Sequence, residues 1–430
     1  MNAWLRRLSL VCGALSILLG IGSGCVPKIG LAPTHEPITI RFAYREHTAQ
    51  LQSLFDAFHE KYPWITIDPV EAERWGDQAE MMLRSGVVDV LRDGREALSY
   101  AQDGLLRPLD DIQLGDWAGI RDDYYRAAWE GLSVQGQQWG VPVGMDMLVV
   151  YVNMSQARAL KVDVPEADWS LFEFVELATK LNYPDGLPHA ETGRLFGYCT
   201  TLETVDPIVF IYLHGGKVVN NINAPTEATL DNPLTIEAVQ WYSDLYNLHN
   251  LVPDAEVIGN TFRRGGIYEA QMRGACGVWL GWYSSRGGLD MPFEWTLDWR
   301  MLPLPRQRAE FGVGDVEGYF ITKDCAHPKE ALLLLRFLAN HWEASGQKLP
   351  PRRSMVNEDS YEEAVGEDVA AIARTFSDQA LMMPVVYSES MQVLGKELTS
   401  AIEQIVTEDL DAASVLAEAQ DRVRTVFESP

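Results

Sequence analysis

Basic residues are scarce in this 430-residue chain: 35 lysines and arginines stand against 61 aspartates and glutamates, for a formal net charge of −26. No run of lysines or arginines is long enough to follow a phosphate backbone, so we expect no nucleic-acid partner. Cysteine is scarce too, with five in the chain and no C-x-x-C spacing, which argues against a structural zinc site. Cys199, Cys276 and Cys325 are widely separated, so one pair could form a disulfide, but they make no disulfide framework.

Motifs of catalysis are also missing. The sequence contains no G-x-S-x-G, no H-E-x-x-H, no phosphate-binding P-loop and no EF-hand spacing. Its eight histidines are scattered, and none forms a pair at metal-ligand spacing beside an acidic residue. We therefore predict a protein that is not an enzyme and that needs neither a metal nor another cofactor.

The N-terminus has an apolar run that is too short to span a membrane. It extends from Leu8 to Ile21 behind Arg6 and Arg7, as in the apolar region of an export signal. The small residues 22–24 then precede Cys25, an order similar to that of bacterial lipoprotein signals, although Gly22 stands where an apolar residue is usual. We predict a signal peptide at 1–24, lipidation of Cys25 and a tether at 25–37. The alternative is an ordinary signal peptide with Cys25 unmodified.

Strand-like and helical segments alternate after the tether. Segments 38–44, 64–70 and 87–91 are short and apolar, as strands are, and helical patterns separate them. The first helical pattern places four apolar residues on one stripe: Leu51, Leu54, Phe55 and Phe58. Such alternation is typical of an open α/β sheet with helices on both faces, where ligands bind beyond the carboxyl ends of the strands. The length exceeds one ordinary core, so we expect two lobes.

The stretch from Trp139 to Asn153 is central to this arrangement. Trp139–Pro142 has the glycine and proline of a turn, and Met147–Val152 is an unbroken apolar run typical of a strand buried on both faces. The residues between them would carry the chain from one lobe to the other. Asp146 lies at this junction.

Eight short blocks occur in a fixed order along the chain. They are Phe58–Pro63, Val87–Val90, Gly104–Asp110, Trp139–Pro142 with Tyr151–Asn153, Asp168–Ser170, Gly277–Trp279, Gly318–Lys323 and Leu349–Ser354. In this order they resemble the extracellular solute-binding proteins of ABC importers, in the family that contains maltose- and other sugar-binding proteins. The resemblance covers essentially the whole chain after the signal peptide.

The resemblance implies an α/β, two-lobed periplasmic-binding-protein-like fold, each lobe a sheet flanked by helices. The first lobe would comprise 38–144 with 318–348, and the second 148–311 with 352–430. About three hinge crossings would join them, near 143–147, 312–317 and 349–351. Glycines 312, 314 and 318 fit such a role, because a few terminal residues absorb a hinge motion.

Sugar sites combine aromatic faces with carboxylates. The resemblance places Trp279 at the ligand-stacking tryptophan of the family and Asp146 at a carboxylate of its cleft. The predicted ligand-binding residues are Tyr44, Trp75, Asp93, Asp146, Trp279, Trp282, Tyr283 and Glu317. In the alternatives, Trp279 is a core residue and only Trp282 reaches the ligand, and Trp75 packs at the surface or between the lobes. Asp146 would then cap a helix or turn, and Asp93 and Glu317 would be merely solvated. For Arg352 we favour a salt bridge over a ligand contact.

The function implied is that of a monomeric substrate-binding lipoprotein. It would capture a sugar or oligosaccharide between the lobes and present it to the permease subunits of an ABC transporter. It would be extracytoplasmic and anchored to a bacterial membrane by its lipid. The alternatives are an exported glycoside hydrolase, which also joins tryptophans with two carboxylates, and a lipid-anchored adhesion protein with no small ligand.

Overall fold

The computed structural model describes residues 35–45, 49–71, 75–112, 118–186, 193–202, 205–222, 225–262, 265–288, 294–308, 312–382 and 389–428. The predicted signal peptide and Cys25 lie outside these residues. Met1–Glu36 and Pro37–Pro430 are separate units, and the description below concerns the second.

The first part of the sheet is parallel, as the alternating pattern predicts. β1 (Ile38–Tyr44) lies between β2 (Ile65–Glu71) and β3 (Val90–Asp93). Helices α1 (Ala49–Lys61) and α2 (Trp75–Arg84) connect these strands. The four residues of the predicted apolar stripe in α1 are all buried. Short elements follow: η1 (Arg95–Ala97), α3 (Leu98–Gln102), β4 (Leu106–Arg107), η2 (Leu109–Asp111), α4 (Ala118–Arg121), α5 (Arg126–Gly131), β5 (Ser133–Val134) and β6 (Gln137–Gln138).

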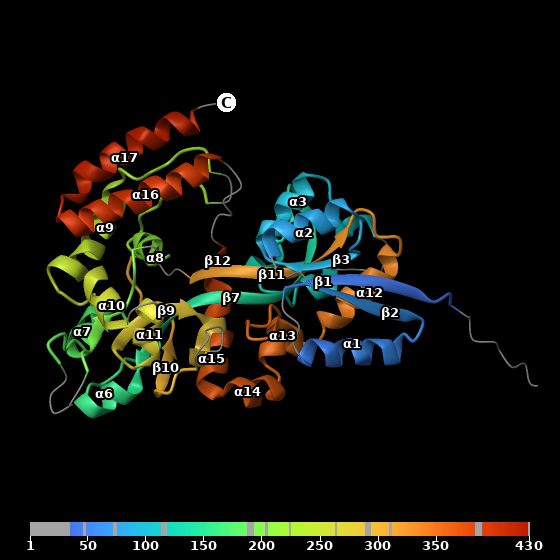
Figure 1. The fold of residues 1–430 in the computed structure, drawn as a ribbon, viewed down its shortest axis with the longest axis horizontal. Coiled ribbons are helices and arrows are strands. Elements are labelled where there is room, and N and C mark those ends of the chain that lie inside the picture. Colours follow the sequence, from blue (N-terminus) through green and yellow to red (C-terminus); the bar gives the residue numbers. More distant parts are fainter. Residues whose placement is uncertain are drawn as a thin grey trace, which may run out of the picture. The chain divides into compact units, whose positions relative to one another are not determined.

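The sheet is organised around β7 (Gly140–Asn153), whose 14 residues are all buried. Its first half pairs antiparallel with β11 (Gly312–Thr322), and its second half pairs with β9 (Cys276–Trp282) and β10 (Trp299–Leu302). The strand order is β2-β1-β3-β11-β7-β9-β8, with β8 at Phe196–Tyr198. Figure 1 shows β7 and β11 between the group of α1, α2, α3 and α12 and the group of α6 to α11 with α16 and α17.

The predicted turn at Trp139–Pro142 is wrong, because the strand already begins at Gly140. Pro142 has no N–H to donate, yet it is tolerated inside β7. It lies opposite Gly318, where the register with β11 shifts after Glu317. A β-bulge of this kind leaves a position that needs no ladder hydrogen bond.

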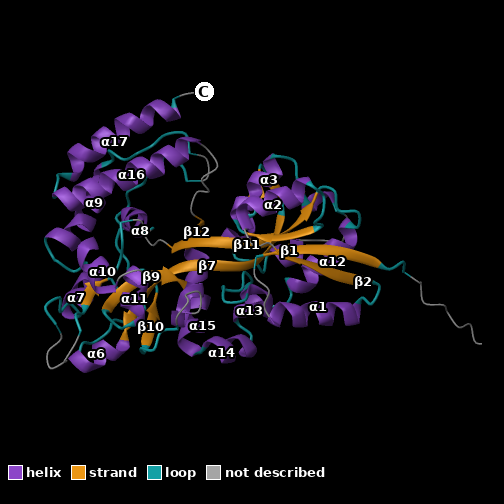
Figure 2. Ribbon diagram, viewed as in Figure 1, coloured by secondary structure: helices purple, strands orange, loops and turns teal. Residues whose placement is uncertain are grey.

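Helices dominate the rest of the chain, as Figure 2 shows. They are α6 (Met154–Leu160), α7 (Leu171–Lys180), α8 (Asp206–Leu213), α9 (Pro233–Asn247), α10 (Ala255–Phe262), α11 (Gly266–Met272), η4 (Tyr283–Gly288), α12 (Pro328–Leu338), η5 (Trp342–Ser345), α13 (Arg353–Val356), α14 (Asp359–Val365), α15 (Glu367–Phe376), η6 (Ser377–Gln379), α16 (Glu389–Glu408) and α17 (Ala412–Phe427). A twelfth strand, β12 (Ala380–Met382), pairs with the start of β11. None of the helices in the described ranges is both long and apolar enough to span a bilayer.

Two capping residues show why helices start where they do. The Ser170 hydroxyl accepts a hydrogen bond from the Glu173 N–H, and the Glu173 carboxylate accepts one from the Ser170 N–H, forming a capping box at α7. Asn153 is fully buried and caps α6, while its amide donates to the carbonyls of Gly274 and Cys276. The end of β7, the start of α6 and the start of β9 are thereby fixed together.

Two of the hydrophobic clusters lie at opposite ends of β7. One contains Val141 and Val143 with α1 and α12, and the other contains Val150 and Val152 with α7, α9, α16 and α17. At the second end, Cys199 and Cys276 form a disulfide that joins the loop after β8 to the start of β9. Cys325 is a buried thiol. The sequence alone did not predict which of the three cysteines form the disulfide.

Candidate functional site at the strand crossing

The three predicted crossings lie side by side. Residues 144–147 of β7 pair with 314–317 of β11. Leu349 forms two backbone hydrogen bonds with Met145, each 2.8 Å between nitrogen and oxygen. Segments from three distant parts of the sequence therefore meet at one place. That they act as hinges, and that the lobes have the predicted boundaries, stay predictions.

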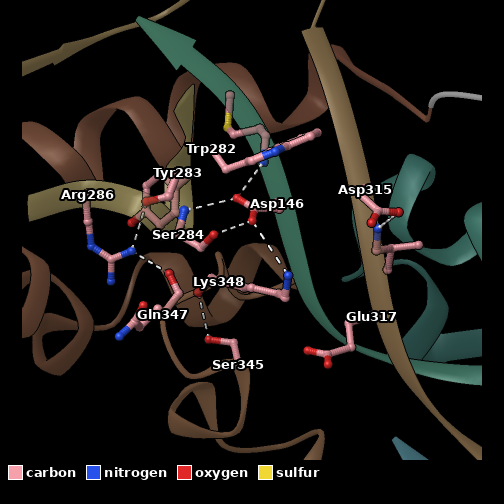
Figure 3. A network of polar contacts seen from close by, with 12 residues as sticks. Asp146, Trp282, Tyr283, Ser284, Arg286, Asp315, Glu317, Ser345, Gln347 and Lys348 are labelled. Atoms are coloured by element: carbon pink, nitrogen blue, oxygen red, sulfur yellow. Dashed lines mark hydrogen bonds and ion pairs between the residues drawn. The ribbon is translucent and has the colours of Figure 1, made fainter. Parts of the chain in front are cut away.

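Asp146 is buried at this meeting point, with 5% of its surface exposed. Its carboxylate accepts hydrogen bonds from the Ser284 N–H at 3.1 Å and the Ser284 hydroxyl at 2.5 Å. The ammonium of Lys348 lies 3.6 Å from Oδ2. Figure 3 shows these contacts converging from η4 and from the third crossing. Asp146 thus links β7 to both segments, and a ligand would have to share its oxygens with them.

Glu317 is half-buried on β11, opposite Gly144. Its carboxylate forms an ion pair with Arg92 of β3, 2.9 Å between oxygen and nitrogen. Burial raises the pKa of Glu317, but the charge and hydrogen bond of Arg92, with smaller contributions from Lys348 and Arg45, hold that pKa below its ordinary value. Glu317 is therefore a carboxylate that stays ionised at neutral pH.

Aromatic side chains gather beside the crossing on β7 and β9. Trp279 is 1% exposed and stacks on Tyr151, with 5.8 Å between ring centroids, and Trp295 packs edge-on against both rings. Trp282, opposite Leu148, is only half-buried. The Tyr151 hydroxyl donates to the Trp282 carbonyl at 2.7 Å, so the stacked cluster fixes the backbone that carries the more exposed indole.

The remaining predicted residues lie at the ends of neighbouring strands. Tyr44 ends β1 and Asp93 ends β3, and both are buried. Tyr283 is fully buried, and its hydroxyl is hydrogen-bonded to the Tyr361 hydroxyl. Trp75 is the first residue of α2, but its side chain lies outside the described part of the structure.

Arg352 forms the predicted salt bridge. Its Nε lies 2.7 Å from Oδ2 of Asp123, whose carboxylate also accepts from the N–H and hydroxyl of Ser354. Among the described residues, no group of three or more His, Cys, Asp or Glu side chains is placed to hold a metal ion. A groove of about 650 Å³ runs along α16 from Met391 to Glu403, and a cavity of about 210 Å³ lies beside Tyr124. None of the eight predicted ligand residues lines either of them.

Sequence reasoning missed four polar residues at the crossing: Arg92, Ser284, Asp315 and Lys348. A usable signal existed for all four. Arg92 precedes Asp93, Ser284 follows Tyr283, and Lys348 precedes the Leu349–Pro351 crossing. Asp315 lies within the predicted 312–317 crossing. Their partners come from distant parts of the chain, which no local pattern reveals.

The profile of the bacterial extracellular solute-binding protein family matches residues 44–341. No curated protein matches the sequence significantly.

Several solved structures are similar over nearly the whole chain. An ABC substrate-binding protein from Listeria monocytogenes in complex with cycloalternan is 16% identical, with a TM-score of 0.72, over 92% of this chain and 100% of that one. The sugar-binding protein MalE from Xanthomonas citri is 17% identical, with a TM-score of 0.69, over 91% and 97%. UgpB from Mycobacterium tuberculosis in complex with glycerophosphocholine is 16% identical, with a TM-score of 0.70, over 92% and 99%. The predicted two-lobed periplasmic-binding-protein fold is confirmed.

Proposed function

Because the chain belongs to the family of bacterial extracellular solute-binding proteins, we propose that it captures a sugar or oligosaccharide between its two lobes and presents it to the permease of an ABC importer. The observation that carries this proposal is the crossing, where three chain segments, the carboxylates of Asp146 and Glu317 and an indole-rich cluster meet. Aromatic faces pack on the C–H surface of a sugar ring, while carboxylates accept hydrogen bonds from its hydroxyls.

The mechanism is a shift between open and closed arrangements of the lobes. A ligand that contacts both lobes binds the closed form more tightly and moves the equilibrium towards it. Of the predicted contacts with described side chains, Trp282 and Glu317 are the half-buried ones. We therefore place these two at the centre of the proposed contact surface, with Asp146 holding the crossing behind them.

The proposed location is extracytoplasmic. The Cys199–Cys276 disulfide supports it, because disulfides persist in oxidising compartments. Export by the predicted signal peptide and anchoring through lipidated Cys25 remain part of the proposal. Mass spectrometry of the protein from bacterial membranes tests the anchor: an acylated N-terminal cysteine supports it, and an unmodified soluble chain contradicts it.

The ligand class is tested by a thermal-shift screen followed by calorimetry. The panel contains maltose, maltotetraose, cycloalternan and tagatose, with glycerophosphocholine as the non-carbohydrate probe. A ligand that binds only the folded chain raises the free energy of unfolding, by about 2.7 kcal/mol at a ligand concentration of 100 Kd. The melting temperature rises with it. Binding of a carbohydrate that chromatography shows to be intact supports the proposal. Binding of glycerophosphocholine alone overturns the carbohydrate assignment, and cleaved sugar identifies a hydrolase.

A further inference from the structure

Three carboxylates share one face of the β7–β11 crossing. Asp146 and Asp315 are direct register partners, and Glu317 follows Asp315 by two residues. Opposite residues of an antiparallel pair point to the same face, as do residues two apart along a strand. Like charges directly opposite each other destabilise the pairing. The strands are nevertheless paired through this region, so other groups must offset the repulsion.

Two of the carboxylates each have a hydrogen-bond partner on one other element. Asp146 accepts from the N–H and hydroxyl of Ser284, and Glu317 pairs with Arg92. Asp315 accepts a hydrogen bond from the N–H of its own neighbour Val316, at 2.8 Å. These contacts bind each carboxylate to the protein, but none of them joins one carboxylate to another.

Lys348 lies beside β7, one residue before the segment that pairs with Met145. Its ammonium is 3.6 Å from Asp146, and its charge contributes to the low pKa of Glu317. Its aliphatic stem packs on the backbone at Gly144, where an added Cβ would be 3.1 Å from both its Cβ and its Cδ. Figure 3 shows Lys348 reaching towards Asp146, with Asp315 and Glu317 on the facing strand.

The backbone of Lys348 is itself held in place. The next residue, Leu349, is hydrogen-bonded in both directions to Met145, and the Ser345 hydroxyl donates to the Lys348 carbonyl at 3.0 Å. The side chain is two-thirds buried. A cation held this closely interacts with its neighbours more strongly than an exposed one, because the effective dielectric constant is lower.

We propose that Lys348 is a positioning residue that holds Asp146, Asp315 and Glu317 at a fixed spacing across the three chain crossings. In the absence of its charge, the carboxylates of β7 and β11 repel each other and the crossing loosens. The consequence for ligand affinity rests on the proposed function, whereas the consequence for the crossing itself does not.

Hydrogen exchange of the ligand-free protein, followed by mass spectrometry, tests the crossing. Lys348→Met keeps the stem over Gly144 and removes the charge. We expect peptides that cover 143–147 and 312–317 to exchange at least fivefold faster than in the wild type, while Lys348→Arg stays within twofold. Lys329→Met, which removes an exposed lysine on α12, is the matched control and leaves both peptides unchanged.

A second substitution, Asp315→Asn, tests the repulsion between the carboxylates independently. In the wild-type background it removes one repelling charge and slows exchange of the same peptides, and combined with Lys348→Met it restores slow exchange. The proposal is overturned if Lys348→Met exchanges like the wild type, or if Asp315→Asn fails to rescue it. In the second case the repulsion by Asp315 is not what the lysine offsets.

Affinity is measured separately, by calorimetry with maltotetraose. We expect Lys348→Met to raise Kd at least fivefold and Lys348→Arg to leave it nearly unchanged. If neither the wild type nor any variant binds a carbohydrate of the panel, the proposed function fails. The hydrogen-exchange result still decides the role of Lys348.

Discussion

At the scale of single residues, the two tryptophans of β9 have different environments. Trp279 is enclosed by Tyr151, Trp295 and the strand, whereas Trp282 keeps part of its indole in solvent. Burial of a fully enclosed ring stabilises the fold, whereas a half-buried ring has a face that can stack on a ligand. The sequence places both within four residues, so burial is what separates them.

Replacing each tryptophan by alanine separates these roles. We expect Trp282→Ala to weaken carbohydrate binding at least tenfold, about 1.4 kcal/mol, with a small loss of stability. Trp279→Ala removes a core ring and is expected to lower the free energy of unfolding by about 3–5 kcal/mol. Calorimetry and urea denaturation measure the two effects. Trp279→Ala with normal stability and lost affinity would show that Trp279, as the family resemblance implies, is the ligand contact.

At the scale of elements, the sequence predicts the helices and strands that depend on a local pattern of residues. The apolar stripe of α1 is confirmed because its spacing depends on nearby residues alone. The capping box at Ser170 and Glu173 is equally local. The turn at Trp139–Pro142 is wrong because a bulge opposite Gly318, far away in the chain, makes room for Pro142 inside a strand. The partners of Asp146 could not be predicted for the same reason: Ser284 is 138 residues away.

Gly318 shows how closely β7 and β11 approach. A Cβ built there would lie 2.3 Å from Leu132 Cδ1 and 2.9 Å from the Val141 carbonyl oxygen. We expect Gly318→Ala to lower the free energy of unfolding by about 1–3 kcal/mol, because overpacking forces the strands apart. Gly395→Ala in α16, where an added Cβ meets nothing within 4 Å, is the control and should stabilise by about 0.5–1 kcal/mol. Urea midpoints measure both, and equal midpoints would contradict this account of Gly318.

The disulfide between the β8 loop and β9 is a second link between elements. It closes a loop with a sequence separation of 77, which in the chain-entropy description stabilises by about 4 kcal/mol. We expect Cys199→Ser with Cys276→Ser to lower the melting temperature markedly. The conservative control Cys325→Ser removes the buried thiol and should have a much smaller effect. A double variant as stable as the wild type would show that strand pairing and packing hold β8 to β9 without the disulfide.

At the scale of the whole molecule, acid should destabilise the fold in two stages. His214 is 2% exposed, and burial lowers the pKa of its imidazole below the ordinary 6.5. The unfolded chain therefore takes up this proton more readily, so the free energy of unfolding falls as pH drops below 6.5. For Glu317, Arg92 outweighs burial and holds the pKa below 4.5, so its stabilising contribution is lost as pH falls further, through that lowered pKa.

Melting temperatures between about pH 2 and 8 measure this profile. We expect a decline that begins near 6.5 in the wild type, and His214→Gln should remove this first decline while keeping the later one. An unchanged profile in His214→Gln would assign the decline to other groups.

The position of β7 in the chain has a consequence for how the protein reaches its native state. β7 ends at Asn153, but the strands that satisfy its edges, β9 and β11, begin at Cys276 and Gly312. Until those residues are available, an apolar strand of 14 residues has no ladder partner on either side. Such long-range pairing makes folding slow and the waiting chain prone to aggregation. Under the proposed export, the same delay would keep the chain unfolded until most of it has crossed the membrane.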